Sequence, residues 1–111
     1  MTLQEAHNFL FEPLPYCGCG DPQAILEKIQ ACLEYAENWQ AQGLEWSGVV
    51  EQLFAGETAA AYLVFYLLDD VDLVGHAASL HEPWLTETGR GFLYALREHG
   101  CAAVAEGNKN L

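Results

Sequence analysis

The chain has 111 residues, of which 51% are hydrophobic and 18% are charged, a composition typical of one globular domain rather than a disordered segment. Its sixteen Asp and Glu residues outnumber its four Lys and Arg residues, which gives a formal net charge of −12. Binding to a nucleic acid backbone requires several cations that displace condensed counterions, so this charge argues against direct binding of DNA or RNA.

We expect a cytoplasmic protein that does not bind membranes. Residues 1–15 lack the basic start of a signal peptide, and they contain Glu5 and Glu12. The longest apolar run, residues 59–68, is about half as long as a bilayer crossing requires. In a reducing compartment the four cysteines are expected to be thiols or metal ligands rather than disulfides.

Residues 1–20 are expected to form an N-terminal helix followed by a loop of cysteines and glycines. Thr2 and Glu5 have the spacing of a capping box, which predicts a helix through about Leu10. The run Cys17-Gly18-Cys19-Gly20 then precedes Asp21-Pro22. An N-cap acid followed by a proline at the first helical position predicts the start of the next helix there.

Cys17 and Cys19 are the candidate metal ligands. Backbone amides and the dipole at a helix N-terminus stabilise a thiolate, which favours binding of zinc or iron and also redox reactivity. A zinc site usually has four ligands, and the sequence offers further candidates without placing them near this pair. These candidates are His7, His76, His81, His99 and Cys101. The alternative is a tight turn that depends on the glycines rather than on the sulfur atoms, with no cofactor.

The sequence pattern of residues 21–57 predicts two helices. Apolar residues recur at helical spacing from Ile25 to Ala36, so the first of these helices is expected to end near Gln42. Cys32 lies on its apolar side and is expected to be a small core residue. The second predicted helix covers residues 45–54.

A third helix of the body is predicted at residues 58–70. Its side chains are apolar on every side from residue 62 to 68, so we expect it to be central or to be covered partly by a partner chain. Tyr62 and Tyr66, four residues apart, are expected to share one helix face. Three acidic residues lie at its end, Asp69, Asp70 and Asp72.

A two-stranded ribbon and a last helix are predicted after these acids. Residues 73–76 and 83–85 have the pattern of short strands separated by a turn. Thr86 is the expected N-cap of a helix that ends at Gly100. The tail from Cys101 is alanine-rich and then polar, and it is expected to fray.

The run Trp84-Leu85-Thr86-Glu87-Thr88-Gly89-Arg90-Gly91-Phe92-Leu93 resembles the segment that follows the wing in winged-helix regulators of the PadR and MarR kind. In those families an aromatic-Leu-Thr-acid-x-Gly-Arg run closes the wing strand and starts the last helix. The resemblance implies that residues 58–70 take the position of the recognition helix and residues 73–86 that of the wing. With CGCGDP early and WLT-x-x-G late, the whole chain also looks like small proteins of bacteria and their phages that have no assigned activity.

The residues at the positions that read DNA in that fold differ from the usual ones in this sequence. A recognition helix needs polar and basic side chains, whereas residues 59–68 are apolar and residues 73–86 contain no Lys or Arg. We therefore predict a mainly α fold with a short antiparallel β-hairpin, a winged-helix-like (α+β) single domain. Its expected parts are an N-terminal helix and Cys-Gly loop at 1–20, a body at 21–100 and a flexible tail at 101–111.

No enzymatic activity is predicted. Ser47 and Ser79 lie outside a nucleophile-elbow motif, and the sequence contains no phosphate-binding or dinucleotide-binding loop. The acids at positions 69, 70 and 72 offer oxygen ligands for a divalent cation, but their spacing is not that of a calcium loop.

The function predicted is a non-enzymatic, acidic protein-interaction module, expected to bind a protein partner and to form a homodimer. Tyrosine and tryptophan are enriched at the centres of protein interfaces. The alternative is an acidic mimic of nucleic acid that inhibits a nucleic-acid-binding protein. A third, weaker hypothesis is a metal or redox sensor that uses Cys17 and Cys19. The expected partner-binding residues are Tyr62, Tyr66, Asp69, Asp70, Asp72 and Trp84.

Overall fold

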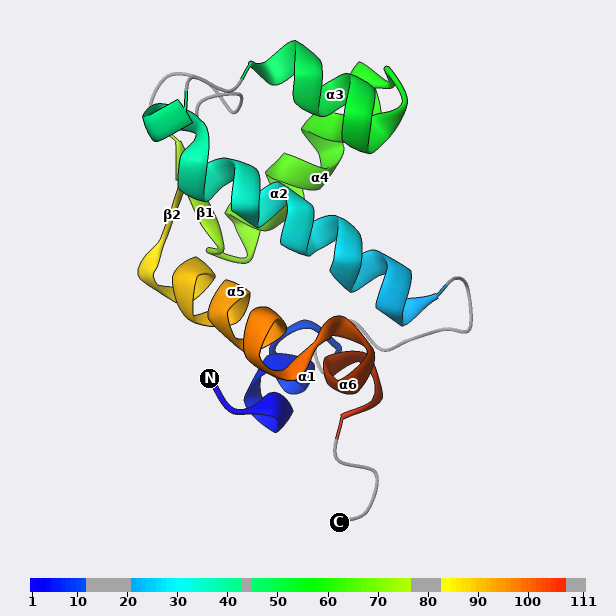
Figure 1. Cartoon of the computed structure of the whole chain (residues 1–111), viewed down its shortest axis with the longest axis vertical. Helices are drawn as coiled ribbons and strands as arrows, with labels where there is room; N and C mark the ends of the chain where they lie inside the picture. Colours follow the sequence, from blue (N-terminus) through cyan, green and yellow to red (C-terminus); the bar gives the residue numbers. More distant parts are fainter. Residues whose placement is uncertain (12–20, 43–44, 77–82, 108–111) are drawn as a thin grey trace. The chain divides into compact units, whose positions relative to one another are not determined.

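The computed structural model describes residues 1–11, 21–42, 45–76 and 83–107 (Figure 1). This part of the chain contains six helices and two strands, which confirms the prediction of a mostly helical fold with a short antiparallel pair of strands. In chain order the elements are α1 (Leu3–Phe11), α2 (Pro22–Gln42), α3 (Trp46–Phe54), α4 (Thr58–Asp70), β1 (Val74–His76), β2 (Pro83–Leu85), α5 (Glu87–His99) and α6 (Cys101–Glu106).

The chain clusters into two compact units. One consists of Met1–Gln30 and Gly91–Leu111, and the other of Ala31–Arg90. Helices α2 and α5 contribute residues to both units, because the boundaries fall within these two helices. The predicted single domain, with its division at residues 20 and 100, stays a prediction.

Two helices begin as the sequence predicts. Thr2 Oγ1 accepts a hydrogen bond from the backbone N–H of Glu5 at 3.1 Å, and Glu5 Oε1 accepts one from the N–H of Thr2 at 2.9 Å. The bond that the Thr2 backbone N–H donates to the carboxylate is the main cause that lowers the pKa of Glu5, because it favours the ionised form. At α2, Asp21 Oδ1 accepts a bond from the N–H of Gln23 at 3.0 Å, with Pro22 at the first helical position.

The predicted flexible tail is wrong over residues 101–106, which form α6. Cys101 and Val104 of this helix are buried. The Nδ1 atom of His7 in α1 lies 2.7 Å from the carbonyl oxygen of Val104, and a carbonyl only accepts, so Nδ1 carries the proton. Gly107, with φ of +68°, lies against the same imidazole ring, where a Cβ would come within 2.9 Å of Cγ. Contact with α1 therefore orders a segment whose alanines give little apolar signal.

Phe65 of α4 lies at the centre of the core formed by residues 31–90. Its side chain is fully buried, and its ring centroid lies 6.0 Å from that of Tyr35 in α2 and 5.3 Å from that of Trp46 in α3. Trp46 also contacts Tyr62 in α4, at 5.2 Å between ring centroids. Ring pairs of this kind contribute about 0.5–1.5 kcal/mol each beyond the burial of their area. The cluster therefore fixes which side of α4 points inward.

The two strands pair antiparallel, and Figure 1 shows them side by side. Their register joins Val74 with Leu85, Gly75 with Trp84, and His76 with Pro83. Strand β2 has the predicted bounds, whereas β1 begins one residue later than predicted, at Val74. The predicted turn at residues 77–81 lies outside the described residues.

Thr86 joins the ribbon to α5. Its hydroxyl accepts a hydrogen bond from the N–H of Gly89 at 2.9 Å, as an N-cap side chain does. The same hydroxyl lies 2.6 Å from the carbonyl oxygen of Asp72 and 3.1 Å from that of Leu73, and it donates to these acceptors. A Cβ built on Gly89 would overlap the Leu73 carbonyl oxygen, so no larger residue fits without a shift of the backbone. The Thr-x-x-Gly part of the motif is therefore a structural junction.

Removing the Thr86 hydroxyl is expected to weaken this junction. We expect Thr86→Ala to lower the free energy of unfolding by about 1–2 kcal/mol, because the N-cap bond and the bonds to the two carbonyl oxygens are lost together. Urea denaturation followed by circular dichroism measures this change. Thr86→Ser keeps the hydroxyl and is the control. An equal loss in the serine variant would assign the effect to the methyl group and contradict the hydrogen-bonded role.

The two sides of α4 are expected to respond differently to truncation. Phe65→Ala removes a fully buried ring and is expected to lower the free energy of unfolding by about 3–5 kcal/mol. Leu63 is 70% exposed, so Leu63→Ala is expected to change it by less than about 0.5 kcal/mol. Denaturant titration of both variants measures the difference. Comparable losses would mean that both sides of α4 are covered in the isolated chain.

Candidate functional site

The exposed side of α4 is the candidate binding surface. Leu63, Tyr66 and Leu67 are 70%, 58% and 44% exposed, and their spacing of three and four residues places them on one side of the helix. We call these three residues the α4 face. Three of the seven large apolar side chains that are exposed in the described part of the chain lie within this five-residue segment. Such clusters on a soluble protein mark interaction sites more often than single exposed residues do.

Tyr62 and Tyr66, which we expected to share one face, lie in different environments. The Tyr62 ring is half-buried against Trp46, whereas Tyr66 is exposed. Four residues turn a helix by about 400°, so Tyr66 is rotated by about 40° from Tyr62, and here this separates the edge of the core from solvent. Leu63 and Leu67 were not singled out from the sequence. Their spacing around Tyr66 was the available signal.

Three acidic residues lie at the C-terminal end of α4 or just beyond it, Asp69, Asp70 and Asp72. Asp70 lies three residues after Leu67 and continues the same exposed stripe. Asp72 is exposed as well, with φ of +63°, a left-handed conformation that Asp tolerates better than most residues. Asp69 is half-buried, and its Oδ1 lies 3.5 Å from Nδ1 of His76 in β1. Asp70 and Asp72 are therefore the two carboxylates most accessible to a partner.

Trp84, also expected to bind a partner, lies across the ribbon. Its side chain is 45% exposed, and its indole covers the position opposite it in β1, Gly75. A Cβ at Gly75 would lie 2.6 Å from Nε1 of Trp84, so the glycine makes room for the ring. This arrangement fixes a half-exposed aromatic side chain on the ribbon.

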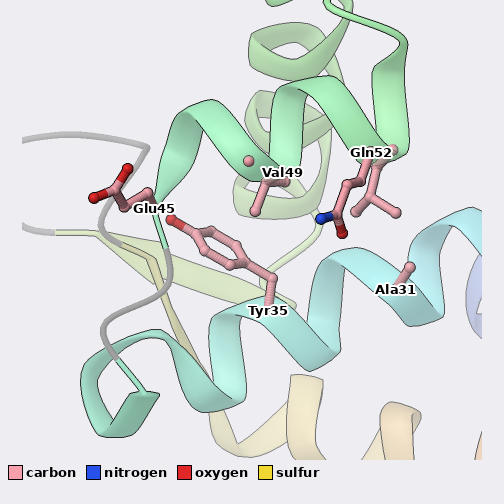
Figure 2. Close-up of a pocket in the computed structure, with 7 residues that line it drawn as sticks. Ala31, Tyr35, Glu45, Val49 and Gln52 are labelled. Atoms are coloured by element: carbon pink, nitrogen blue, oxygen red, sulfur yellow. The ribbon is translucent and has the colours of Figure 1, made fainter.

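A shallow pocket of about 250 Å³ lies between α2 and α3 (Figure 2). In Figure 2 the side chains of Tyr35, Val49 and Gln52 point into the space between the two helices, whereas the Glu45 carboxylate points away from it. A pocket of this size is smaller than a typical cofactor site, and its walls are mainly apolar. Tyr35 also belongs to the aromatic cluster that holds α4. The residues that line the pocket are Ala31, Tyr35, Glu45, Gly48, Val49, Gln52 and Leu53.

The candidate metal ligands are not brought together in the described residues. Cys17, Cys19 and His81 lie outside these residues, so a zinc or iron site at the Cys-Gly loop stays a prediction. Within residues 1–11, 21–42, 45–76 and 83–107, no three His, Cys, Asp or Glu side chains form a group that could hold a metal ion. Cys101 donates to Oε1 of Gln30 at 3.1 Å, and Cys32 is buried, as predicted.

Within the described residues, no helix is long and apolar enough to span a membrane. No protein-family model matches the chain, and neither a curated protein nor a solved structure matches it. The order α4, β1, β2, α5 is the one implied by the resemblance to PadR and MarR regulators. Membership of those families stays a prediction.

Substitution of a crowded glycine and of an uncrowded one tests the contact between Gly75 and the indole of Trp84. We expect Gly75→Ala to displace the indole and to lower the free energy of unfolding by about 1–3 kcal/mol, because the added methyl overlaps the ring. The displacement is measured from the NMR signal of the Trp84 indole N–H. Gly48→Ala is the control, since a Cβ there meets nothing within 4 Å. We expect it to raise the free energy of unfolding by up to about 1 kcal/mol. An unchanged indole signal in Gly75→Ala would contradict the contact.

Proposed function

We propose that this chain is a non-enzymatic protein-interaction module whose binding surface is the α4 face. The supporting observation is the exposure of Leu63, Tyr66 and Leu67 on a helix whose opposite side is fixed in the core. Covering apolar surface contributes about 25 cal/mol per Å², so a partner gains free energy directly from these side chains. In a winged-helix-like scaffold this surface replaces the polar and basic one that reads DNA.

The α4 face is preformed in the absence of a partner. Phe65 and Tyr62, on the inner side of the helix, contact Trp46 of α3 at 5.3 and 5.2 Å between ring centroids. A partner therefore does not have to order the helix, which lowers the entropic cost of association. A second copy of the chain and a different protein can both cover such a face, and the predicted homodimer would use it as a two-fold contact.

The acidic mimic of nucleic acid is the second candidate. It is favoured by the exposure of Asp70 and Asp72 at the C-terminal end of the helix that carries the α4 face, in a chain with a net charge of −12. In this case the partner is a nucleic-acid-binding protein, and the carboxylates occupy the positions of phosphates. Such a complex is expected to dissociate as the salt concentration rises, since screening weakens exposed charge pairs.

Photo-crosslinking inside the source cells tests the binding surface. A photoreactive amino acid at position 66 is expected to give one discrete adduct, because that side chain is 58% exposed at the centre of the face. The double variant Leu63→Gln/Leu67→Gln is expected to abolish the adduct while changing the free energy of unfolding by less than about 0.5 kcal/mol.

The control places the same photoreactive group at Glu98, an exposed position in the other unit. Adducts of equal yield from positions 66 and 98 would contradict the proposal, and so would an adduct that survives Leu63→Gln/Leu67→Gln. The mass of the adduct separates a second copy of this chain from a different protein.

A further inference from the structure

The unit that carries the α4 face is strongly acidic. Residues 31–90 contain ten Asp and Glu residues, and Arg90 is their sole Lys or Arg. Acidic side chains flank α4 at both ends, because Glu57 precedes the helix and Asp70 and Asp72 lie at its end, all three exposed. Of these three, Asp70 continues the stripe of the α4 face, so exposed negative charge lies at the C-terminal end of that face.

A second copy of the chain fits this surface poorly. In a parallel pair of α4 helices packed through this face, the two Asp70 side chains approach each other, and in an antiparallel pair Asp70 meets the first turn of the other α4, which has no Lys or Arg to pair with it. Like charges opposed across an interface disfavour association. The three side chains of the face expose roughly 300 Å², the size of a large patch on a monomer, whereas a stable interface buries about 800 Å² per partner. The face alone does not supply a stable dimer.

A partner with Lys or Arg beside its apolar side chains avoids the repulsion between like charges. Neighbouring side chains on a helix stripe lie about 5–6 Å apart, so Asp70 is within the screening length of about 8 Å from the apolar contact at Leu67. Attraction between opposite charges then adds to a small apolar contact and speeds association. Phosphate-bearing partners, such as nucleic acids and anionic lipid surfaces, are repelled by the same carboxylates.

We propose that the α4 face binds a basic amphipathic segment of another protein. Its apolar side chains cover Leu63, Tyr66 and Leu67, and its Lys or Arg side chains lie against Asp70 and Asp72. This inference rests on the proposed function and specifies the chemistry of the partner.

Three synthetic peptides test it with the full-length chain. They share one amphipathic pattern of leucines and differ at the polar positions, which are all Lys, all Gln or all Glu. Isothermal titration calorimetry measures the dissociation constants. The Lys peptide is expected to bind at least about tenfold more tightly than the Gln peptide at low salt, and the Glu peptide not to bind. This preference is expected to shrink as NaCl is raised from about 0.05 to about 0.5 M.

Matched variants separate a local effect from net charge. Asp70→Asn/Asp72→Asn is expected to weaken binding of the Lys peptide about three- to tenfold. Asn suits the left-handed backbone at position 72. Glu98→Gln/Glu106→Gln removes the same two charges from exposed positions in the other unit, and it is expected to change the affinity less than about twofold. Equal effects of the two pairs would overturn the inference.

The remaining outcomes separate this inference from the proposed function. Lys and Gln peptides that bind equally well, and that are both lost in Leu63→Gln/Leu67→Gln, would overturn the basic partner and leave the α4 face as an interaction surface. Lys-peptide binding that survives Leu63→Gln/Leu67→Gln would be attraction by charge alone and would count against both. Salt-resistant dimers in light scattering, lost in Leu63→Gln/Leu67→Gln, would identify a second copy as the occupant and overturn the inference.

Discussion

The burial of Phe65 determines which side of α4 faces solvent. Its ring lies against Tyr35 and Trp46, so the helix cannot rotate without opening the core. Successive residues on a helix are about 100° apart, which places Leu63 and Leu67 about 160° from Phe65, almost on the opposite side. The exposed apolar face is therefore a geometric consequence of one inward-facing ring. The binding proposals depend on that constraint.

The starts of α1, α2 and α5 were predictable from the sequence because their chemistry is local, whereas Thr58 is the first residue of α4 and not the N-cap expected for it. Thr2 with Glu5, and Asp21, satisfy backbone N–H groups within three residues of themselves, and Thr86 does the same for Gly89. Helix α6 was not predictable, because its order depends on a contact between His7 and Val104, which are 97 residues apart in the sequence. Local rules carry no information about such a contact.

The candidate site was predictable only in part. Tyr66 and the acids after it were found by residue type, whereas Leu63 and Leu67 were not. A helix that is apolar on every side has no periodicity to show which side is buried, so tertiary contacts alone decide it. The Thr-x-x-Gly motif, by contrast, was visible in the sequence, but its role is structural. The hydroxyl of Thr86 and the close approach of Gly89 to Leu73 explain this motif without any role in binding DNA.

The contact between α1 and α6 has a consequence for how the chain folds during synthesis. Residues 31–90 form a continuous unit, so its contacts can form while residues 91–107 are still being added. The other unit combines residues 1–30 with residues 91–111, and His7 meets its acceptor only after Val104 has left the ribosome. Until then α1 lacks its partner helix, and Phe9 lacks the ring of Phe92. Helix α1 is therefore made before α2 to α5 but is fixed in place only after α6 has been made.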